Sequence, residues 1–158
     1  MTNPSWKDLA RKKVEAKPDG LWNMVVPYVS GPRLLRLTVV ELDDQQAVVG
    51  KTWRPTANDQ CSANGILKTA QSKSPFLLDT APFGALIGKI GGSTADLPDT
   101  SPTAGPYPGK KPFACGEYAV VALASTDSGP LFLSMNDGPE FFADHAGELW
   151  VLIEEAPV

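Results

Sequence analysis

The sequence has very few of the side chains on which most enzymes and zinc sites depend. Its 158 residues include one histidine, His145, and two cysteines, Cys61 and Cys115. A closed structural zinc site takes four cysteine or histidine ligands, so these residues fall one short. A catalytic triad or a cysteine–histidine pair would have to use His145 alone. We therefore expect no enzymatic activity from this chain.

The two cysteines also lack the CxxC spacing that is typical of redox motifs and zinc ligands. Spacing alone does not decide whether their Cβ atoms meet. For a chain without a secretory leader we expect reduced, partly buried thiols.

Positive charge is scarce as well. The formal net charge is −4, and basic residues adjoin one another only at 11–13 and 110–111. Nucleic-acid binding needs a clustered positive surface. We therefore expect no nucleic-acid partner, and we interpret both clusters as solvated surface.

Long apolar runs are absent from the sequence. The longest, about 118–124, is far shorter than the roughly 18–20 residues of a membrane-spanning helix. Residues 1–13 are charged and contain no apolar core of a signal peptide. We expect no membrane span, and either a cytoplasmic location or export without a cleavable signal peptide.

Turn-forming residues, in contrast, are abundant. The chain has 14 glycines and 15 prolines, which disfavours a helical bundle and favours many short strands joined by turns. The length suits one domain with a substantial core. Period-2 apolar patterns predict strands near 21–29, 34–42, 47–53, 76–79, 85–91, 117–125, 131–135 and 148–155. We expect 117–125, which is apolar on both faces, to be a central strand, and 54–74 and 93–111 to be loops.

Only the first segment has helix signals. Asn3 precedes Pro4, and Ser5 precedes Asp8 by three residues; both arrangements are typical of a helix start. We predict a helical extension over residues 1–20 and a β-sandwich domain of jelly-roll type over 21–158.

The loop 136–147 lies between two predicted strands and carries Asp137 and Asp144. Two carboxylates held close together repel each other unless a cation lies between them. Calcium accepts such oxygens in flexible geometry. Two alternatives stay open on the residues alone: a solvated turn without metal, and an acid/base pair acting on a glycoside, for which no companion feature is present.

Four sequence blocks narrow these alternatives. They are GKTW with CSANG (50–53 and 61–65), APFGALIGKIGGS (81–93), FACG (113–116) and LFLSMNDGPEFFADHAG (131–147). Over roughly 34–153 the chain resembles the PA-I-type bacterial lectins, the calcium-dependent galactose-binding family. The resemblance implies a small jelly-roll β-sandwich with one calcium ion at its edge. Vicinal hydroxyls of a sugar complete the coordination of that ion.

The resemblance also implies a set of calcium ligands. Asp137 would be a bidentate carboxylate ligand that also touches the sugar, and Phe141 would supply its backbone carbonyl. Asp144 and His145 match a pair of side-chain ligands, although the family has an asparagine where this chain has His145. Asn64 would supply a further carbonyl. Imidazole is a poor match for calcium, which prefers oxygen.

A second sugar-contacting loop corresponds to 67–79 and would place Gln71 against the sugar. This loop lacks the histidine that is typical of galactose binders. Aromatic rings can stack on a sugar face, and the candidates are Trp22, Trp53, Tyr107 and Trp150. We expect Trp53 and Trp150, which lie in strand patterns, to be core residues.

Two functions follow as hypotheses. The first is a carbohydrate-binding module that recognises a galactose-type sugar through a loop-bound calcium ion. The second is a β-sandwich interaction or assembly domain with a degenerate metal site and no sugar ligand. His145, the bulky residues 141–142 and the added N-terminal helix favour the second. A homo-oligomer is compatible with either.

Overall fold

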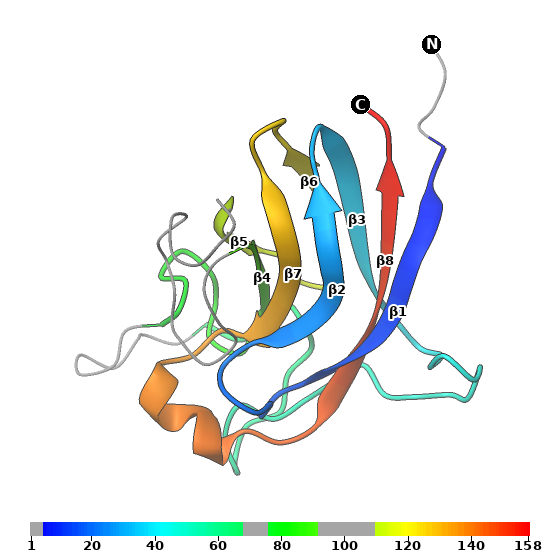
Figure 1. The fold of residues 1–158 in the computed structure, drawn as a ribbon. Helices are drawn as coiled ribbons and strands as arrows, with labels where there is room; N and C mark the ends of the chain where they lie inside the picture. The colour runs from blue at the N-terminus through cyan, green and yellow to red at the C-terminus, as the bar shows by residue number, and fades with distance from the viewer. Residues whose placement is uncertain (1–4, 68–75, 92–109) are drawn as a thin grey trace.

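The protein is a sandwich of two antiparallel four-stranded sheets (Figure 1). The computed structural model describes residues 5–67, 76–91 and 110–158. Sheet A has the strand order β1-β8-β3-β6, and sheet B has the order β2-β7-β4-β5. The elements are β1 (Lys7–Glu15), β2 (Asn23–Ser30), β3 (Arg33–Val40), β4 (Leu86–Ile90), β5 (Lys110–Ala114), β6 (Tyr118–Leu123), β7 (Ser128–Met135), the 3₁₀ helix η1 (Pro139–Asp144) and β8 (Glu148–Ala156). The predicted all-β sandwich is confirmed.

The core lies between the sheets, because alternate residues of each strand point inward. From β3, β7 and β8 these residues are at most 4% exposed: Leu35, Leu37, Val39, Leu131, Leu133, Met135, Leu149, Val151 and Ile153. The predicted strands near 34–42, 85–91, 131–135 and 148–155 are confirmed within a few residues. Pro27 lies in β2, an edge strand of sheet B with two register shifts, as expected for a proline in a strand.

A second apolar cluster covers the outer face of sheet B. Its buried members are Leu21, Trp22, Leu77, Ala81, Ile87, Phe132 and Phe142. Lys89 is only 2% exposed, and its ammonium lies 5.0 Å and 5.1 Å from the ring centroids of Trp22 and Phe132. This cluster brings residues 77–81 and η1 together beside the end of β7, where the predicted site lies.

The predicted N-terminal helix is wrong. Residues 7–15 form β1, which pairs along β8 at the right of Figure 1 and so belongs to sheet A. Val14 and Ala16 alternate inward and are 0% exposed, so the end of this segment buries its apolar side chains in the core between the sheets. Tertiary pairing therefore overrides the local capping signals.

Three strand predictions also need correction. The segment 117–125 forms β6, but among the described strands β6 lies at the edge of sheet A and not at its centre, and its Tyr118 is 58% exposed. The segment 47–53 makes only isolated bridges within the described part of the chain, and its Val48 is 83% exposed. The segment 76–79 is not a strand, because Leu77 and Leu78 hydrogen-bond the loop after β7 instead.

Of the two tryptophans predicted to lie in the core, one does and the other does not. Trp53 is 1% exposed, and its indole N–H donates to the Gly84 carbonyl at 2.9 Å, so its predicted core position is confirmed. Trp150 is only half-buried because it lies on the outer face of sheet A, and its expected core position is wrong. Trp22 is 2% exposed within the second apolar cluster. Tyr107 lies outside the described residues.

Candidate functional site

The candidate site is the connection from β7 to β8, which contains η1 and is drawn in orange in Figure 1. Asn136, the first residue of this loop, ties the loop to the second apolar cluster through hydrogen bonds. The buried Asn136 amide donates to the Leu78 and Ala81 carbonyls at 2.8 Å and 2.9 Å and accepts from the Leu78 N–H at 2.9 Å. The loop therefore leaves β7 in a fixed direction.

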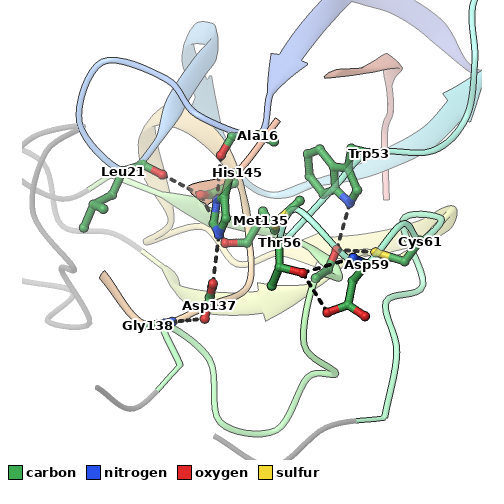
Figure 2. A network of polar contacts seen from close by, with 12 residues as sticks. Ala16, Leu21, Trp53, Thr56, Asp59, Cys61, Met135, Asp137, Gly138 and His145 are labelled. Atoms are coloured by element: carbon green, nitrogen blue, oxygen red, sulfur yellow. Dashed lines mark hydrogen bonds and ion pairs between the residues drawn. The ribbon is translucent and has the colours of Figure 1, made fainter. Parts of the chain in front are cut away.

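Asp137 is buried at 3% exposure, and both of its carboxylate oxygens are engaged. Oδ2 lies 2.8 Å from Nε2 of His145, and Oδ1 accepts the Gly138 N–H at 2.7 Å (Figure 2). The Asp137 backbone carbonyl accepts the Leu77 N–H at 3.1 Å. This carboxylate is thus held from within the loop.

His145 links this loop to the end of β1. Its side chain is 0% exposed, and its Nδ1 lies 2.9 Å from the Ala16 carbonyl oxygen (Figure 2). The Phe142 ring packs against the imidazole with 4.4 Å between ring centroids. The ring therefore has a polar contact at each nitrogen and an apolar contact at its side.

The two contacts of the imidazole constrain its protons. The Ala16 carbonyl can only accept a hydrogen bond, so Nδ1 must carry a proton. The 2.8 Å contact between Nε2 and Asp137 then needs one more proton between them. That proton makes either an imidazolium–carboxylate ion pair or a neutral imidazole facing a carboxylic acid. Either arrangement leaves the buried pair with no net charge.

The other predicted ligands are more exposed than this pair or lie outside the described residues. Asp144, the last residue of η1, is exposed, and Phe141 is half-buried within η1. Asn64 is exposed on another loop, where its Oδ1 accepts the Glu117 N–H at 2.9 Å. Gln71 lies outside the described residues.

The donor set can be tested against calcium, which takes six to eight oxygen ligands. Within residues 5–67, 76–91 and 110–158, no group of three or more histidine, cysteine, aspartate or glutamate side chains could hold a metal ion. Both Asp137 oxygens already have partners, and the group opposite Oδ2 is a nitrogen. In this arrangement both Asp137 oxygens have protein partners, so a calcium ion at Oδ2 would have to displace His145.

Sequence reasoning missed the two residues that build this arrangement. Ala16 acts through its backbone carbonyl, which no side-chain pattern can reveal. Asn136 could have been found from the sequence, because it directly follows an apolar strand, and a buried side-chain amide needs hydrogen-bond partners.

A neighbouring segment, 53–61, holds the far side of the loop. Arg54 and Ala146 exchange backbone hydrogen bonds at 2.8 Å and 2.9 Å. Thr56 donates its hydroxyl to Asp59 at 2.8 Å in the same segment (Figure 2). Gly147 has a φ of +90°, and a Cβ there would lie 3.3 Å from the Trp53 Cα. The sharp turn before β8 therefore requires glycine.

Both cysteines are free and buried. Burial raises the pKa of the Cys61 thiol to about 11 and that of the Cys115 thiol to about 12, from an ordinary value of 9.0. Because the thiolate is the nucleophile and metal ligand, neither sulfur is activated for such chemistry at neutral pH.

No helix among the described residues is long and apolar enough to cross a membrane. No protein-family model matches the sequence, and no match to it was found among curated proteins.

Proposed function

We propose that this chain is a β-sandwich interaction domain that needs neither calcium nor sugar. In it, the Asp137–His145 hydrogen bond replaces the calcium ion that the family resemblance implies. The observation that carries the proposal is the 2.8 Å contact between Nε2 of His145 and Oδ2 of Asp137. That contact occupies the carboxylate that the resemblance makes the central metal ligand.

The physical basis is charge compensation. A buried carboxylate is costly unless a positive group or a proton neutralises it. In a calcium lectin the ion serves this purpose; here the proton shared with His145 does so. His145, which departs from the family pattern, therefore supplies the charge compensation that Asp137 would lose without the metal. The Ala16 carbonyl keeps the imidazole in the required orientation.

A second candidate is the calcium-dependent galactose-binding module. It is favoured by the placement of Asp137, Phe141, Asp144 and His145 in one loop, at one end of the sandwich, with Asp144 exposed. For calcium to reach Asp137, His145 would have to give up its hydrogen bond with Oδ2. Calcium binding would then compete with the buried pair, and its apparent affinity would fall accordingly.

Calcium titration and a glycan array separate the two candidates. For the wild-type chain we expect no heat of calcium binding, no glycan signal, and no thermal shift between EDTA and millimolar calcium. Binding at 100-fold above Kd would add about 2.7 kcal/mol to stability, an effect that thermal melting detects easily. Calcium-dependent glycan binding that D137N abolishes would overturn the proposal and establish the lectin.

The H145N variant sharpens this test. It restores an oxygen donor at the one position where the chain departs from the family's ligand pattern and frees Oδ2 of Asp137. We expect this variant, unlike the wild type, to gain a calcium-dependent rise in Tm.

A further inference from the structure

Strand β6 leaves one edge of sheet A without a neighbour among the described residues. It pairs with β3 on one side, and sheet A ends there. Tyr118 and Val120, which alternate along β6, are 58% and 48% exposed. An exposed edge of this kind presents backbone groups that can pair with another chain.

The register shows which groups face outward. The Val39 N–H donates to the Glu117 carbonyl at 2.9 Å, which makes Val39 and Glu117 a hydrogen-bonded pair. Such pairs alternate with non-hydrogen-bonded pairs along an antiparallel ladder. The partners of β3 are therefore residues 119, 121 and 123. The N–H and C=O groups of Tyr118, Val120 and Ala122 point to the open edge.

The other three edge strands carry features that oppose edge-to-edge pairing. The β1 edge has a register shift between Asp8 and Ala10 and carries the exposed Lys12. The β2 edge has Pro27 and two register shifts. The β5 edge has Pro112 and a register shift opposite it in β4. Strand β6 has no proline and no lysine, and its six residues pair with β3 without a shift.

The arginine beside this edge, Arg36, already has a carboxylate partner. Arg36, opposite Val120 in the ladder, donates to both carboxylate oxygens of Glu154 at 2.8 Å. The Trp6 ring lies over its guanidinium at 4.3 Å. The sequence YAVVAL of β6 has no charged residue. A charged peptide would find no counter-charge along this strand, whereas a second β6 is equally neutral.

We infer that β6 pairs with β6 of a second copy of this chain, antiparallel, about a twofold axis beside Val120. In this register Tyr118 lies opposite the partner's Ala122, so a large side chain faces a small one on both sides of the axis. The two copies of sheet A become one eight-stranded sheet. A single self-complementary strand contact of this kind is isologous and closes on itself, so it yields a dimer and not a filament.

This inference rests on the proposed interaction function and names its partner. One strand pair buries less surface than the roughly 800 Å² per partner of a standard stable interface. We therefore expect a concentration-dependent dimer.

Analytical ultracentrifugation of the full chain in EDTA, from micromolar to millimolar concentration, tests the inference. We expect a monomer–dimer equilibrium whose dissociation constant rises at least about tenfold in V120P, which removes the N–H at the twofold axis. V120K, which places two like charges opposite each other, should have the same effect. M24K is the matched control, because Met24 is 55% exposed on the β2 edge, and it should leave the constant unchanged.

Amide hydrogen exchange gives a second readout within the folded protein. The amides of Tyr118, Val120 and Ala122 should gain protection as the concentration rises, whereas those on the outer side of β2 should not. A chain that stays monomeric throughout would overturn the inference. So would a dimer that V120P and V120K leave intact. Calcium-dependent glycan binding, in contrast, would overturn the proposed function without bearing on a dimer measured in EDTA.

Discussion

The loop after β7 and the edge strand β6 differ in whether their polar groups have hydrogen-bond partners. In the loop, Asn136, Asp137 and His145 are all buried, and each polar side-chain atom has a partner inside the protein. Along β6, the backbone N–H and C=O of every second residue point to an edge along which no described strand pairs. Buried polar groups whose hydrogen bonds are all made fix one conformation, whereas unpaired backbone groups at a sheet edge can pair with a partner strand. This difference is one reason why we propose an interaction function and not chemistry in the loop.

Removing Asp137 should produce the largest effect. D137A leaves Nε2 of a fully buried imidazole without a partner, and we expect unfolding to become easier by about 3–5 kcal/mol. D137N keeps the shape, and its amide can donate to Nε2 while its oxygen accepts from Gly138. We expect less than half of that loss. Urea denaturation measures both variants, and equal losses would show that the hydrogen bond does not matter.

Proline substitutions at adjacent positions of β6 should produce the next largest difference. V121P removes an N–H directed at β3 and leaves the Leu35 carbonyl without its donor, which should cost about 3 kcal/mol. V120P removes an N–H directed at the open edge and should cost the monomer less than about 1 kcal/mol. Both are compared by denaturation at a concentration where the chain is monomeric. Similar losses would mean that the edge assignment is wrong.

The smallest expected effect concerns Cys115, which lies between β5 and β6. Burial raises the pKa of its thiol from 9.0 to about 12. The unfolded chain therefore loses this proton at a lower pH than the folded chain. The contribution to stability is complete below pH 9 and falls as the pH rises toward 12.

C115A should flatten this alkaline decline in the urea midpoint, measured between about pH 8 and pH 10.5. C61A is the matched comparison and should have a smaller effect, because the pKa of Cys61 rises only to about 11. A decline that is unchanged in C115A would contradict the assigned burial effect.

Much of the sandwich could be predicted because its strands alternate strictly. In β3 and β8, every second residue is apolar, and that pattern alone places one face in the core. The same reasoning failed for β6. A strand that is apolar on both faces predicts cover on both sides, but no property of its sequence says whether a neighbour lies beyond it. The helix predicted from the capping residues in 3–8 was likewise wrong, because the segment pairs as β1 with β8.

Some features of the candidate site could likewise be predicted from the sequence, and others could not. The sequence could single out the loop 136–147 and His145 as a candidate site, because the chain has a single histidine and it lies between two strands. The calcium ligands expected from the resemblance remain a prediction for Asp144, Phe141, Asn64 and Gln71. The direct contact of His145 with Asp137 could not be predicted, since it depends on the carbonyl of Ala16, just after β1, which holds the other nitrogen.

The sequence by itself determined an all-β sandwich and singled out His145, because alternation and composition are local properties of the chain. Only the tertiary structure decided that Ala16 and Asp137 hold the imidazole between them, and that β6 ends a sheet. Both depend on contacts between segments far apart in sequence. Such contacts are set by which surfaces pack together, and no single segment encodes that choice.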